Sequence, residues 1–164
     1  MGIGWQQAAL AGVAVLFLGF LLARLWPSSR GRAALGADVR AARDRARGAD
    51  TPRARAEALC DAGRLSARGQ GRWTAAAGFF IRALNADPTS SDVVVQLTQT
   101  FRRRRPRLLE KILWRRLGLL PWDDAHRASL REITVGLAAL YERELRDKSR
   151  AEVMRRLGKT FEPL

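Results

Sequence analysis

Apolar residues recur at helical spacing along most of this 164-residue chain, and glycine or proline interrupts the pattern at regular intervals. A stripe with a period near 3.6 residues is typical of amphipathic helices, and no stretch alternates long enough to predict a strand. We expect one helix from about Pro52 to Arg68 and a second from Trp73 to the break at Asp87–Pro88. A third helix is expected after the capping residues Thr89–Ser91, and a fourth from Pro106 to Gly118. A fifth begins near Asp123, and a shorter sixth ends at Gly158. The fold class is therefore all-α over this part of the chain, with antiparallel helix pairs.

The inward face of each expected helix follows from the same spacing. Candidate core residues are Trp73, Ala76, Ala77, Phe80, Ala83, Leu84, Val94, Leu97, Phe101, Leu109, Ile112, Leu113, Leu117, Leu130, Ile133, Leu137, Leu140, Tyr141, Val153, Met154 and Leu157. Cys60, the only cysteine, is expected to be a small core residue as well, because one cysteine excludes an intramolecular disulfide and a CxxC site.

One segment carries a repeat motif. Gly71-Arg72-Trp73, Ala76, Phe80, Ala83-Leu84 and Asp87-Pro88 resemble the second half of a tetratricopeptide repeat, a helical hairpin that stacks on its neighbours. The match is looser elsewhere, since Gly63 lies one position early, Ala67 replaces an aromatic residue, and Glu110 stands where a small crossing residue belongs. The resemblance implies a tetratricopeptide-like domain over residues 52–164; another helical bundle is the alternative.

The N-terminal segment predicts a membrane anchor. No charged side chain occurs from Gly2 to Ala23, and twenty-one helical steps span about 31 Å, close to the thickness of a bilayer. Trp5 and Trp26 stand where interfacial anchors belong. We therefore expect residues 1–26 to form a single transmembrane helix, followed by a basic juxtamembrane linker over 27–51 with a short helix from Ala33 to Arg47. A cleaved secretory signal is the alternative, but its basic n-region and small-residue cleavage site are missing.

The distribution of arginines predicts the orientation of this helix. Arginines follow the apolar segment and none precedes it, so the positive-inside rule places the N-terminus outside and the C-terminal domain in the cytoplasm, in a single-pass inner-membrane protein. Small residues four apart would let a second helix approach the span: Ala8, Gly12, Gly19 and Ala23. An N-terminal span before helical hairpins also resembles the layout of the bacterial lipopolysaccharide assembly protein B family. The metal module of that family is missing here, so none of its functional residues is carried over.

The net charge of +14 and the pI near 11.6 favour an anionic partner. The densest basic patch comprises Arg102, Arg103, Arg104, Arg105, Arg107, Arg115 and Arg116. These guanidinium groups can bind carboxylates or phosphates, so the patch predicts contact with an acidic or membrane-embedded protein or with an anionic lipid surface, and nucleic acid is an alternative. A plain solvated surface is the simplest interpretation. Trp114 nearby could stack on a base, but its place in the repeat favours the core.

Two carboxylates and the only histidine cluster at Asp123-Asp124-Ala125-His126. Such a set can bind a metal or transfer protons. A helix cap explains it better, because either aspartate suits the first turn of the fifth helix. We predict no catalytic residue, no metal, no cofactor and no small-molecule substrate.

These features together predict a non-catalytic, membrane-anchored adaptor that presents a basic helical domain to a protein partner. The alternatives are a membrane-tethered nucleic-acid-binding protein and an accessory subunit of a larger membrane complex.

Overall fold

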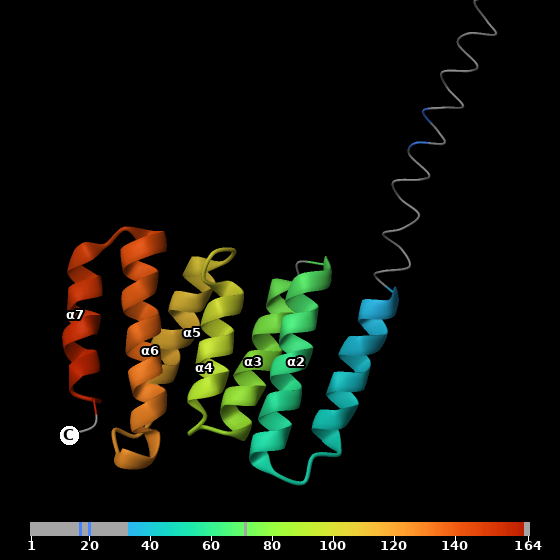
Figure 1. The fold of residues 1–164 in the computed structure, drawn as a ribbon, viewed down its shortest axis with the longest axis horizontal. Helices are drawn as coiled ribbons and strands as arrows, with labels where there is room; N and C mark the ends of the chain where they lie inside the picture. The colour runs from blue at the N-terminus through green and yellow to red at the C-terminus, as the bar shows by residue number, and fades with distance from the viewer. Residues whose placement is uncertain (1–16, 18–19, 21–32, 71, 163–164) are drawn as a thin grey trace, which may run out of the picture.

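The computed structural model describes residues 17, 20, 33–70 and 72–162, and from residue 33 onward these form a row of antiparallel helices (Figure 1). A helix over 33–47 precedes α2 (Pro52–Gln70), α3 (Trp73–Ala86), α4 (Ser91–Phe101), α5 (Pro106–Leu119), α6 (Arg127–Leu140) and α7 (Lys148–Lys159). A 3-10 turn, η1 (Asp124–His126), leads into α6, and a π-helical turn, η2 (Tyr141–Leu145), extends it. The predicted helices are confirmed, and the described part of the chain contains no strand.

The helices form the hairpins α2–α3, α4–α5 and α6–α7, and each hairpin packs on the next. α4 contacts both helices of the first hairpin, and α6 contacts both helices of the second. The C-terminal ends of α2, α4 and α6 therefore lie at one edge of the row with the N-terminal ends of α3, α5 and α7. We call this the upper edge, since it is uppermost in Figure 1. A row in which each unit contacts its neighbours fits a helical repeat.

One apolar core runs through the described residues, and most of the predicted core residues lie in it. Two predictions were wrong. Val153 is 57% exposed, because α7 packs on α6 through Ala151, Met154 and Gly158, a spacing that turns position 153 outward. Trp114 is 43% exposed and is not a core aromatic.

Glycines mark the places where helices approach most closely. A β carbon at Gly63 of α2 would lie 2.8 Å from the ring of Phe80 on α3, which is fully buried. A β carbon at Gly136 of α6 would lie 3.1 Å from Oγ1 of Thr98 on α4. The absence of a side chain at these positions therefore sets the packing distance within one hairpin and between two hairpins.

The helix over 33–47 packs against α2 at the start of the row (Figure 1). Ala42 is fully buried and Ala46 nearly so, and the two lie four residues apart on one face of this helix. Leu35 occupies the space that a β carbon at Gly69 would need, and Arg45 pairs with Asp61 of α2 at 3.5 Å. This helix therefore adds its apolar side to the core of the first hairpin.

The predicted transmembrane helix is corrected by the structure. Within residues 17, 20, 33–70 and 72–162, no helix combines the length and the apolar character that crossing a bilayer requires. Over the described residues the fold class is therefore all-α without the transmembrane component, and the same finding contradicts the predicted single-pass inner-membrane location. The residues proposed as interfacial anchors and as a helix-packing face lie outside the described part of the chain: Trp5, Trp26, Ala8, Gly12, Gly19 and Ala23.

Candidate functional site

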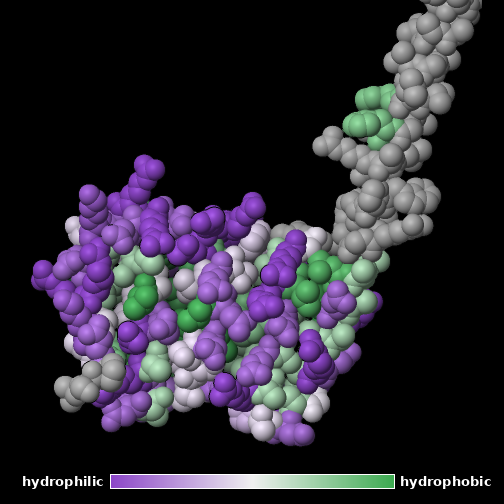
Figure 2. Space-filling model, in the orientation of Figure 1, coloured by the Kyte–Doolittle hydropathy of each residue, from purple (hydrophilic) through white to green (hydrophobic). Residues whose placement is uncertain are grey.

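Two adjoining pockets open at the upper edge, where the first hairpin meets the second. They have volumes of about 780 and 760 Å³ and share the side chains of Trp73 and Arg104. We call the two together the basic groove, because its described lining holds no acidic residue and six arginines: Arg64, Arg68, Arg72, Arg104, Arg105 and Arg107. Hydrophilic side chains also crowd much of the upper edge in Figure 2.

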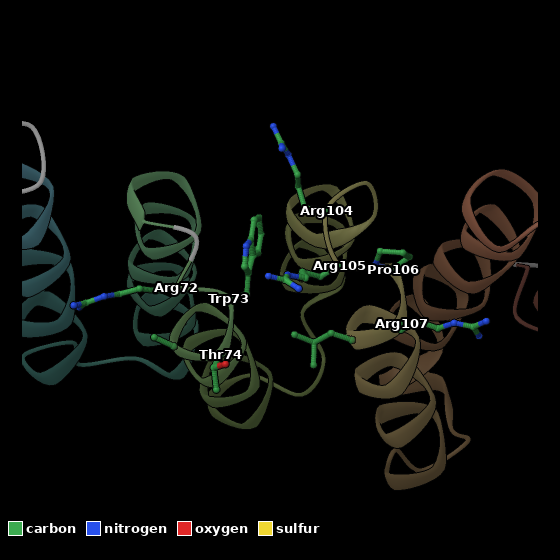
Figure 3. A pocket seen from close by; sticks show the side chains of 9 residues that line it. Arg72, Trp73, Thr74, Arg104, Arg105, Pro106 and Arg107 are labelled. Carbon is green, nitrogen blue, oxygen red and sulfur yellow. The ribbon is translucent and has the colours of Figure 1, made fainter. Parts of the chain in front are cut away.

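Trp73 stands at the centre of the groove as the first residue of α3. Its ring packs edge to face on the buried ring of Phe101, with centroids 5.5 Å apart, and this contact fixes its position. The guanidinium carbon of Arg105 lies 5.9 Å from the centroid of the Trp73 ring, so the two side chains make a cation–π contact. Figure 3 shows Arg105 directed toward the indole, whereas Arg104 points outward from the end of α4.

Two helices begin at this groove without a side-chain cap. Arg72 precedes α3 and Arg105 precedes α5, and neither side chain accepts a hydrogen bond from the helix that follows. The first backbone N–H groups of a helix have no intrahelical partner, and they carry the positive end of the helix dipole. Backbone donors of α3 and α5 therefore add to the guanidinium groups as sites for an anion.

The positive charge of the groove is only partly neutralised. Nη2 of Arg64 lies 3.7 Å from Oδ1 of Asp61, and Nη1 of Arg107 lies 3.2 Å from Oε2 of Glu110. The guanidinium groups of Arg68, Arg104 and Arg105 have no carboxylate partner within the described residues. Exposed guanidinium groups that lack an internal partner can bind carboxylates or phosphates from outside.

Gln96 adds an unsatisfied acceptor to the part of the groove between α2 and α4. Its Oε1 atom is buried and has no hydrogen-bond partner. A buried acceptor without a donor is destabilising. The groove therefore carries a local cost in stability at Gln96 beside the donors that it offers to an anion.

The arginine patch that the sequence suggested is divided among three places. Arg104, Arg105 and Arg107 line the basic groove, Arg102 pairs with Glu144 at 3.6 Å, and Arg103 is exposed beside them. Arg115 and Arg116 lie two turns farther along α5, in a separate pocket that α3 helps to form. The structure therefore joins part of this patch to arginines of the first hairpin.

Sequence reasoning missed Arg64, Arg68 and Arg72, which complete the groove from α2 and the turn after it. Their spacing of four residues could have indicated the groove. It places Arg64 and Arg68 on one face of a helix and Arg72 just beyond the end of that helix.

Asp123 caps the turn that leads into α6, as the capping prediction required. Its Oδ1 atom accepts a hydrogen bond from the backbone N–H of His126 at 3.0 Å and lies 2.6 Å from Nδ1 of the same residue. The hydrogen bond with His126 lowers the pKa of the Asp123 carboxyl. No group of three metal-ligating side chains occurs among the residues that the structure describes.

Cys60 lies in the core, at 1% exposure. Burial raises the pKa of its thiol to about 12, with the nearby charge of Asp61 acting in the same direction. A buried, protonated thiol is a poor nucleophile, so the predicted core role of this residue is confirmed.

Comparison with protein-family models, curated proteins and solved structures finds no match to this chain.

Proposed function

We propose that this protein is a non-catalytic adaptor whose basic groove binds an acidic, extended segment of a partner protein. The observation that carries the proposal is the arrangement around Trp73: uncompensated guanidinium groups and two uncapped helix ends surround one aromatic ring, and no described lining residue is acidic. Carboxylates of the segment would pair with the arginines, and its apolar side chains would pack on Trp73 and Ala67.

A peptide fits the groove better than a nucleic acid does. Single-stranded nucleic acids bind through bases stacked on open aromatic faces. The Trp73 ring is a poor platform, because Arg105 lies over it and its edge contacts Phe101.

We also interpret the three hairpins as degenerate tetratricopeptide-like units. The order of packing supports this interpretation, because α4 and α6 each contact both helices of the preceding hairpin. In such arrays the faces between successive units form binding surfaces, and part of the basic groove lies between α2 and α4, the first helices of two hairpins.

Binding of labelled probes to the full chain tests the proposal. The probes are a fluorescein-labelled decapeptide of alternating Glu and Leu and a labelled single-stranded 20-mer of deoxythymidine, both followed by fluorescence anisotropy. Reversing two charges, R104E with R105E, should weaken peptide binding at least about tenfold, or about 1.4 kcal/mol. The matched control R131E with R143E reverses the same number of exposed charges on α6 and η2 and should change binding less than twofold.

Two results would overturn the adaptor proposal. One is an equal loss of peptide binding in the control pair, which would reduce the effect to net charge. The other is tight binding of the 20-mer with a steep linear dependence on the logarithm of salt concentration, together with no binding of the peptide.

A further inference from the structure

A second groove lies between α3 and α5, apart from the basic groove. Its volume is about 300 Å³, and we call it the α3–α5 groove. Its apolar floor comes from both helices and includes Ile81 and Leu84 of α3 with Leu108, Ile112 and Leu119 of α5. Ile81 is 41% exposed and Leu119 is 65% exposed, so the described structure leaves these two apolar side chains uncovered, whereas Leu84 and Ile112 are buried. Adjoining exposed apolar side chains are typical of an interaction surface.

The lining residues of α5 form one continuous stripe. The apolar positions 108, 112 and 119 and the basic positions 111, 115 and 116 follow one another at steps of three and one residues, a spacing that keeps all six on one helical face. Eleven helical steps from Leu108 to Leu119 extend about 17 Å. A straight groove of this length accommodates about three turns of another helix, whose ridge of side chains would lie between α3 and α5.

The charge along this stripe is not balanced by the chain itself. Lys111, Arg115 and Arg116 have no carboxylate partner among the described residues, and none of the described lining residues is acidic. Arg116 donates a hydrogen bond from Nη2 to the carbonyl oxygen of Leu84 at 2.6 Å, which links α5 to α3. Its Nε atom is buried without a partner, and burial lowers the pKa of its guanidinium group. A partly buried cation without a negative partner is destabilising until an anion reaches it.

We propose that the α3–α5 groove is a second docking site, which binds one amphipathic, acidic helix of a partner protein. Apolar residues of that helix at positions i, i+4 and i+7 would cover Leu108, Ile81 and Leu119. Carboxylates beside them would neutralise Arg115 and Arg116, which fixes the direction and register of the helix. A second copy of this chain does not fit, because each copy carries a net charge of +14.

Two synthetic 14-residue helical peptides with the same leucine stripe test this site on the full chain. One carries Glu beside the stripe and the other carries Lys, and isothermal titration calorimetry measures the binding of each. We expect the Glu peptide to bind and the Lys peptide not to bind. Equal binding of both would overturn the proposal, because charge would then play no part.

Variants of the chain test whether the Glu peptide binds in the α3–α5 groove. L119S and R115E should each weaken the Glu peptide about tenfold, whereas the matched controls V135S and R131E should change it less than twofold, since Val135 is also half exposed but lies on α6. The R104E, R105E variant should keep this binding, which separates the site from the basic groove. Loss of binding in V135S equal to that in L119S would contradict the assignment. Dimerisation of the chain in sedimentation experiments, abolished by L119S, would instead identify a second copy as the occupant.

Discussion

Trp114 of α5 donates a hydrogen bond from its indole Nε1 to the phenol oxygen of Tyr141 at 2.7 Å, and this bond joins the second hairpin to the third. Tyr141 in turn donates to Oε1 of Glu110 at 2.8 Å, and Arg150 of α7 lies 3.5 Å from the same oxygen. Glu110 therefore occupies a position where a small crossing residue was expected, but it does so as part of a polar network. The side chain of Tyr141 is almost fully buried, and this burial is the main reason why its pKa is raised.

Replacing Tyr141 with Phe should destabilise the protein by about 1–3 kcal/mol, because Trp114 loses an acceptor and the largely buried Glu110 loses a donor. Urea denaturation of the full chain measures this free energy. A double-mutant cycle with W114F should give a coupling energy of at least about 0.5 kcal/mol, and additive effects would contradict the linked network.

Replacing Gly63 with Ala should destabilise the protein by about 1–3 kcal/mol, because the added methyl group meets the ring of Phe80, which the core holds in place. Gly78 is a matched control within α3, since a β carbon there has no atom within 4 Å. G78A should therefore stabilise the protein by up to about 1 kcal/mol through helix propensity alone. Thermal unfolding followed by circular dichroism compares the two variants; equal stabilisation would show that the helices do not approach as closely as described.

The Cys60 thiol should resist alkylation while the protein is folded. With a pKa of about 12, only about one thiol in 10⁴ is ionised at pH 8, and its burial also excludes the reagent. Mass spectrometry after treatment with iodoacetamide should show no labelling in buffer and complete labelling in concentrated urea. Rapid labelling of the folded protein would contradict the core position.

Asp123 should make stability depend on pH in the acid range. Its pKa in the folded protein is lowered from the ordinary value of 3.8. The stabilisation is therefore complete above pH 3.8 and is lost as the pH falls through the lower, folded value. The melting temperature of D123N should lie below that of the wild type at pH 5 and converge with it as the pH falls through the lowered pKa of Asp123. Asn can still cap a helix, so the variant isolates the effect of charge; a constant difference over this range would contradict it.

The helix boundaries could be predicted because proline, glycine and capping residues mark them in the sequence. Pro52 and Pro106 begin helices where expected, and Asp87 ends a helix and accepts hydrogen bonds from the N–H and hydroxyl groups of Thr89. The face of a helix is harder to predict at the end of a row. α7 packs mainly on α6 and η2, so spacing alone did not show that Val153 points to solvent.

The basic groove could be predicted only in part, because it depends on how separate segments meet. The arginine run follows the end of α4, so neighbouring side chains point in different directions: Arg102 toward Glu144, and Arg105 toward Trp73 in the groove. Its other arginines lie more than 30 positions earlier in the sequence, and only the packing of α2 beside α4 brings them near. The π-helical turn η2 carried no sequence signal that we could identify.

The arrangement of the helices in a row also determines which part of the protein can unfold by itself. α7 contacts chiefly α6 and η2, so it can detach from the row while the contacts between the first two hairpins stay intact. Its detachment would expose the side of α6 on which Gly158 packs against Thr134, together with the buried side chains of α7 itself, Ala151 and Met154. We therefore expect cleavage near Arg146, in the turn before α7, to expose apolar surface and to favour aggregation.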